Sequence, residues 1–247
     1  MSWIDKVPAV PTVGCFFQPD AMPATTYLEA LRPLINQRLQ EDGKTQVRMP
    51  GPLQLEVLTA GGFKYAISYE RVTVEFNYLY ELDEPPGEMP KLSFKVPVQK
   101  FTDLLHQTIE HEVDILERLL KNEPRPLSQV GIVASCRIDT KTPPPGVEKF
   151  IKHLSQPWGS PLMKCDAHLL AVLRDDGQFR DKCHHKIATG EDAGSEVKLI
   201  LDWQRAIANP LHIRANKIRE EMEKCERDAL EYFEKFGRGE LEYGSTG

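Results

Sequence analysis

The sequence predicts an α+β fold in which long helices pack on one face of a large antiparallel sheet. Residues Leu211 to Phe236 carry apolar side chains at alternating spacings of four and three, which predicts one long amphipathic helix. Residues Leu53 to Val98 instead alternate apolar and polar side chains, as antiparallel strands with one buried face do. The order strand, helix, several strands, helix then occurs twice along the chain. The alternating strands therefore supply the surface that the apolar stripe of the helix needs.

The first half of the chain follows this order. The apolar run Val13 to Phe17 predicts a first strand, and capping-box spacing at Thr26 opens a helix that contains Pro33 and ends at Asp42-Gly43. Several strands come next, separated by a turn signal at Ala60-Gly61-Gly62. The second helix is predicted from Phe101 to Lys121, with an acidic outer face.

The second half repeats the order of elements without repeating the residues. Its predicted elements are a strand at Val130 to Ile138, a short helix at Val147 to Leu154, a hairpin at Leu162 to Ala188 that turns at Asp176-Gly177, a strand at Val197 to Leu201, and the final helix after Asn209-Pro210. We expect halves 1–126 and 127–247, either as two units or as one continuous domain with a shared, curved sheet.

Composition narrows the class of protein. A hydrophobic fraction of 40% with 28% charged residues is typical of a folded globular protein. The net charge of −6 argues against non-specific binding to nucleic acid and against attraction to an anionic membrane. No run of about 18 apolar residues predicts a membrane span, and the N-terminus lacks the layout of a signal peptide. Five cysteines without a Cys-x-x-Cys pair indicate thiols in a reducing compartment, so we expect a cytoplasmic protein.

One local group of residues suggests a metal site on the 162–188 hairpin. A two-residue turn at Asp176-Gly177 places His168 opposite His185, with Cys183 diagonally near. Imidazole and thiolate are zinc ligands, and three of them leave an open coordination position, as in a catalytic zinc site. A turn of another length pairs His168 with His184 or Lys186 instead. The alternative is that these side chains close the end of a buried surface and bind no metal.

Other catalytic patterns are missing from the sequence. It contains no P-loop, no Gly-x-Ser-x-Gly elbow and no His-Glu-x-x-His motif. We therefore predict no catalytic residues, and no cofactor apart from the zinc ion of the hairpin site. The paired carboxylates of the chain lie in turns, in loops or on a helix surface.

The final helix is the best candidate for a partner interface. Its regular stripe persists for more than three heptads and includes Ile218 and Met222, while Leu230 and Phe233 extend the apolar surface beside it. We expect these four residues to meet a second copy or another protein. The alternative is that the helix only covers its own sheet.

Short segments resemble a bacterial family of uncharacterised proteins of about this length that are sporadically distributed among genomes. The resemblance rests on Val130-Gly131-Ile132 with Arg137-Ile138, on Leu199 to Asp202, and on the amphipathic helix that ends near Phe233. The chain departs from the family pattern at Ala134-Ser135-Cys136, which replaces an aromatic residue and an asparagine, and in a late helix without the expected histidine. The resemblance implies no catalytic residues, and the patchy distribution suits an accessory protein of a mobile element or defence system.

Two functions follow from these patterns. The first is a non-enzymatic binding protein that self-associates or docks a protein partner through its C-terminal helix. The second is a metal-dependent hydrolase or nuclease that uses His168, Cys183 and His185.

Overall fold

The computed structural model describes residues 2–18, 24–83, 91–94, 97–121, 125–155, 166–189 and 196–242. Nine antiparallel strands form one open sheet in the order β2-β3-β4-β5-β1-β8-β11-β10-β9. Its strands are β1 (Ala9–Phe17), β2 (Gln46–Gly51), β3 (Gln54–Leu58), β4 (Phe63–Ser68), β5 (Arg71–Phe76), β8 (Arg125–Asp139), β9 (Asp166–Asp175), β10 (Phe179–Thr189) and β11 (Glu196–Ile213). The predicted large antiparallel sheet is confirmed.

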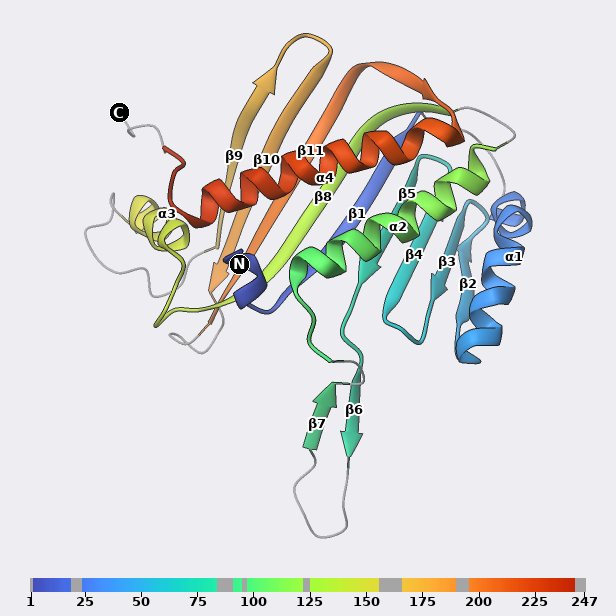
Figure 1. The fold of residues 1–247 in the computed structure, drawn as a ribbon, viewed down its shortest axis with the longest axis horizontal. Helices are drawn as coiled ribbons and strands as arrows, with labels where there is room; N and C mark the ends of the chain where they lie inside the picture. The colour runs from blue at the N-terminus through green and yellow to red at the C-terminus, as the bar shows by residue number, and fades with distance from the viewer. Residues whose placement is uncertain are drawn as a thin grey trace.

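The helices lie on one face of this sheet (Figure 1). They are η1 (Ile4–Lys6), α1 (Ala24–Asp42), α2 (Phe101–Leu119), α3 (Pro145–Ser155) and α4 (Ala215–Gly237). Helices α2 and α4 cross the middle strands, whereas α1 and α3 lie toward opposite side edges of the sheet. A separate two-stranded ladder, β6 (Tyr80–Asp83) with β7 (Lys91–Phe94), lies below the sheet in the view of Figure 1, on the connection between β5 and α2. None of the described helices is long and apolar enough to span a membrane.

The two halves of the chain share the one sheet. The first strand of each half lies at the centre, where β1 pairs with β8 along almost its whole length. The predicted boundary between residues 126 and 127 falls inside β8. A division at that point would break the central strand pairing, so the halves are two parts of one continuous layer.

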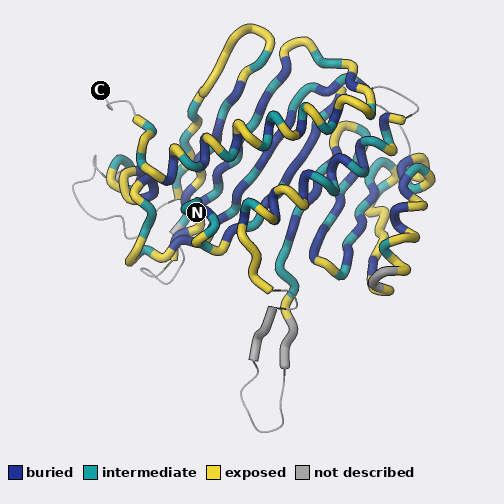
Figure 2. Tube along the Cα trace, in the orientation of Figure 1, coloured by how far each residue is buried: buried dark blue, intermediate teal, exposed yellow. Residues whose placement is uncertain are grey.

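Alternation along the strands gives the sheet two different faces (Figure 2). Val13 pairs with Ile132 and Cys15 with Val130, and all four side chains are buried under α2 and α4. On the opposite face Gly14 pairs with Gly131, and the neighbouring positions are mostly polar or only partly buried. The apolar core therefore lies between the sheet and the helices, and no described helix covers the other face.

The C-terminal helix is shorter than predicted, because strand β11 continues to Ile213. The pairing of β11 with β8 is interrupted between Ala206 and Leu211 and then resumes, with Leu211 opposite Leu127. The interruption accommodates Pro210, which has no N–H for a regular ladder. Leu211 was therefore wrongly assigned to the helix stripe.

Contacts between α2 and α4 join the helices of the two halves. The Phe101 and Phe233 rings pack at 6.4 Å, and Arg219 forms ion pairs with Glu110 at 2.5 Å and Glu117 at 3.7 Å. The indole N–H of Trp3 donates to the Phe233 carbonyl at 2.7 Å. These contacts hold α2, α4 and the N-terminus as one layer.

Candidate functional site

The predicted interface residues of α4 lie in the core. Ile218, Met222 and Phe233 are completely buried within the chain, and Leu230 is partly buried against the same core. The prediction that this stripe meets a partner was wrong because the chain's own sheet and α2 already cover it. These three side chains are therefore not available to a partner.

The predicted metal ligands are not brought together. The loop at Asp176 leaves Asp175 paired with Arg180, and an extra residue in β9 then shifts the register, so His168 lies opposite Lys186 and not opposite His185. A shift of one residue moves a side chain to the other face of a sheet. Cys183 and His185 consequently point toward the helices, whereas His168 lies on the opposite face. No three or more His, Cys, Asp or Glu residues of the described ranges are grouped to hold a metal ion.

His185 is part of the core beneath α4. Its side chain stacks on Phe236 at 5.2 Å, and its Nε2 lies 2.9 Å from the Tyr232 hydroxyl. Burial, followed by the nearby charges of His184 and His168, lowers the pKa of His185 to about 4. The imidazole is therefore neutral at physiological pH and a weak base, which favours a packing role over proton transfer.

A groove of about 440 Å³ runs beside β9, the last strand of the sheet. Its wall includes the five consecutive residues 169–173, and the rest of its lining comes from α3, β10, α4 and the C-terminal segment: His153, His185, Tyr232, Leu241 and Glu242. Successive side chains of a strand point to opposite faces. A hollow lined by five residues in a row therefore reaches the outer edge of the strand.

The edge strand is apolar at the groove. Leu170 is 53% exposed, Val172 is 51% exposed and Leu173 is 37% exposed. None of the described strands pairs with the outer side of β9. Natural proteins usually protect such an edge with charged residues, proline or an irregular backbone. The only such feature within residues 169–173 is the extra residue Leu173, at the point where the register shifts.

The opposite edge strand, β2, carries more protection. It contains Pro50 and the exposed Arg48, and its pairing with β3 shifts between Arg48 and Gly51. Val47 and Met49 are nevertheless exposed by 38% and 52%, so apolar exposure alone does not distinguish the edges. The difference is an uninterrupted apolar run beside a groove, which is found at β9.

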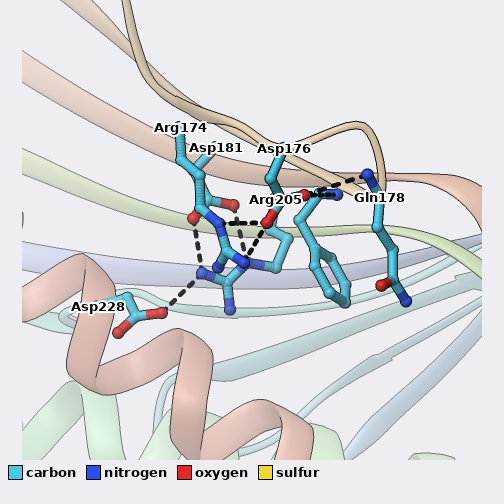
Figure 3. A network of polar contacts seen from close by, with 7 residues as sticks. Arg174, Asp176, Gln178, Asp181, Arg205 and Asp228 are labelled. Carbon is cyan, nitrogen blue, oxygen red and sulfur yellow. Dashed lines mark hydrogen bonds and ion pairs between the residues drawn. The ribbon is translucent and has the colours of Figure 1, made fainter.

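Buried charges fix the strands behind this edge (Figure 3). Arg205 of β11 donates two hydrogen bonds to Asp181 of β10, at 2.7 and 2.6 Å, and one to Asp228 of α4 at 2.6 Å. The guanidinium also lies over the Trp203 ring, 5.1 Å from its centroid. Hydrogen bonds from Arg205 to both carboxylates raise its pKa, so it remains charged. The network connects strands β10 and β11 with helix α4, directly behind β9.

Comparison with protein-family models, with curated proteins and with solved structures gives no match for this chain. The fold and the groove define an α+β protein with an exposed sheet edge.

Proposed function

We propose that this chain is a non-enzymatic interaction protein that associates with a second copy of itself through the outer edge of β9. The observation that carries the proposal is the apolar run 169–173, which lines a groove at the edge of the sheet. An edge strand presents unpaired N–H and C=O groups, and an added strand satisfies them while its side chains fill adjacent pockets.

A second copy fits this edge because antiparallel pairing about a twofold axis is self-complementary. Residues 167–173 contain no Asp, Glu, Lys or Arg, so two copies bring no fixed like charges together. A register centred on Leu170 places Leu170 opposite Leu170 of the other copy and His168 opposite Val172. All five pairs of this ladder precede the extra residue Leu173, so they use the regular part of the strand.

Side chains on the helix side of β9 add to the contact between the two copies. Leu169 and Ala171 alternate with the exposed residues and lie on the face toward α3 and α4. In the proposed dimer these side chains of each copy enter the groove beside the other copy's strand. Their burial adds an apolar contribution of about 25 cal/mol for each Å² removed from water.

Light scattering coupled to size-exclusion chromatography tests the proposal. The wild-type chain is expected at twice the mass of one chain, and the double variant Leu170→Lys, Val172→Lys at the mass of one chain, because charge on an edge blocks strand addition. The matched control is Val47→Lys, Met49→Lys on the other edge, which leaves the dimer intact. A wild-type monomer at all concentrations, or a control variant that dissociates as readily, would exclude association through β9.

A further inference from the structure

Two histidines meet on the face of the sheet that no described helix covers. His168 of β9 and His184 of β10 lie diagonally across the strand pair, since His168 pairs with Lys186. Nε2 of His168 is 2.7 Å from Nδ1 of His184, and the rings are stacked with centroids 4.9 Å apart. The His168 side chain is exposed and His184 is partly exposed, so solvent reaches the pair.

We infer that His168 and His184 form a binding site for a divalent transition-metal ion, with Cu²⁺ the ion that fits best. This pair differs from the hairpin ligands that the sequence suggested, because only His168 belongs to both sets. Each neutral imidazole has one nitrogen with a lone pair, and imidazole is a common ligand for copper, nickel and zinc. Water completes the coordination, since these two side chains supply the protein ligands.

The separation of the two nitrogens favours a particular geometry. Ligands at about 2.0 Å from a metal and 2.7 Å from each other subtend an angle of roughly 85° at the ion. Neighbouring ligands in a square or tetragonal site subtend about 90°, which is the arrangement typical of Cu²⁺. A tetrahedral zinc ion needs its ligands at about 109°, so this pair would have to separate further.

Binding of the metal ion does not change the number of protons on the two imidazoles. Without metal, an imidazole N–H of one ring donates to the bare nitrogen of the other across the 2.7 Å contact. When the ion enters, the donating ring moves its proton to its other nitrogen, and both facing nitrogens then offer lone pairs. No proton is released to solvent and no redox step is involved.

Charged side chains near His184 both favour and oppose the binding of a cation. Asp202 of β11 lies directly opposite His184 and favours a cation, while Lys182 and Lys186 flank His184 along β10 and oppose it. The Asp202 carboxylate accepts hydrogen bonds from Gln204 at 3.0 and 2.9 Å, which fixes its position. Because these charges partly cancel, the two imidazoles determine the affinity.

Copper titration followed by calorimetry and electron paramagnetic resonance tests the site on the full chain. The wild-type protein is expected to bind one equivalent of Cu²⁺ with hyperfine coupling from two imidazole nitrogens. His168→Asn and His184→Asn should each weaken binding by at least about tenfold, as losses around metal ligands do, and should remove the two-nitrogen spectrum. His106→Asn, on the exposed side of α2, is the matched control and should bind like the wild type.

Two results would overturn the inference. One is the absence of a bound equivalent in the wild-type protein. The other is equal binding by the wild type, His168→Asn and His184→Asn, which would identify adventitious copper bound elsewhere. Circular dichroism of each variant checks that the fold is intact.

Discussion

The buried carboxyl group of Glu112 should make the protein less stable as the pH rises. Glu112 is on the inner side of α2 and is completely buried. Neither carboxyl oxygen has a hydrogen-bond partner that satisfies it among the described residues, and the Cys15 thiol lies beside it. Burial raises the pKa of Glu112 from 4.5 to about 8. The folded protein therefore keeps a proton that the unfolded chain releases.

The size of the effect follows from this difference in pKa. Between pH 4.5 and about 8 the folded state binds the additional proton, so the free energy of unfolding decreases with rising pH. Each unit corresponds to about 1.4 kcal/mol, which gives a loss of about 3 kcal/mol at pH 7 and about 5 kcal/mol above pH 8. Total stabilities of about 5 to 15 kcal/mol make this a large fraction.

Urea unfolding of the wild type and Glu112→Gln from pH 4 to pH 9 measures the effect. Glutamine has nearly the same shape and no charge, so the variant should gain about 5 kcal/mol relative to the wild type across this range. Glu223→Gln, on the exposed side of α4, controls for the loss of a carboxylate and should stay within about 0.5 kcal/mol. A difference between Glu112→Gln and wild type that does not change with pH would contradict the raised pKa of Glu112, because it would mean that the folded state ionises this group as readily as the unfolded chain.

Two further predictions concern the connection between helices and sheet. Asp181→Asn leaves the buried Arg205 with one carboxylate partner and should cost about 3 to 5 kcal/mol in urea unfolding, whereas Asp228→Asn removes a half-exposed partner and should cost about 1 kcal/mol. Equal costs would contradict the assignment of the strong pair. Gly146→Ala should destabilise by more than about 1 kcal/mol, because its Cβ would lie 1.5 Å from a carbonyl oxygen of α4. Gly131→Ala, whose Cβ would meet nothing closer than 4.0 Å, should be neutral or raise the melting temperature; a strong loss would mean that the uncovered face is occupied.

The sequence predicted the layers well because periodicity reports which side of an element is buried. The alternation in β5 and β8 and the spacing of apolar residues in α2 correspond to the covered face of the sheet and the inner face of the helix. The repeated order of elements likewise corresponds to two halves of one sheet. These features depend on local patterns of burial, which survive without knowledge of the tertiary contacts.

The pairing register of β9 with β10 could not be predicted from these local patterns. The turn at Asp176-Gly177 was located correctly, and Gly177 has the positive φ of 84° that such turns use. The first paired positions, Asp175 and Arg180, are separated by four residues instead of the predicted two. Leu173 is then an extra, unpaired residue in β9. The resulting shift moved His168 to the other face and brought it to His184. No periodic signal marks one extra residue within a continuous apolar run.

For the final helix, the sequence did not show which surface covers its apolar stripe. Its stripe of Ile218, Met222 and Phe233 was recognised, but a stripe of this kind specifies only that something covers it. The sheet and α2 cover it completely. The buried Glu112 was not singled out because it is one of several acidic residues in α2, and the sequence does not separate the one that points inward.

The burial of the α4 stripe excludes it as the surface of the proposed association. Ile218, Met222 and Phe233 cannot bind a partner unless they leave their own core, at a cost of about 25 cal/mol for each Å² re-exposed. Strand β9 is different, because Leu170 and Val172 are half exposed in the single chain and their contact with a partner adds burial without removing any. The ion pairs of Arg205 hold β10, β11 and α4 together directly behind this strand. Strand β9 is already paired with β10, so adding a second strand to it costs less conformational entropy than ordering a free segment would, and this supports the proposed association at β9.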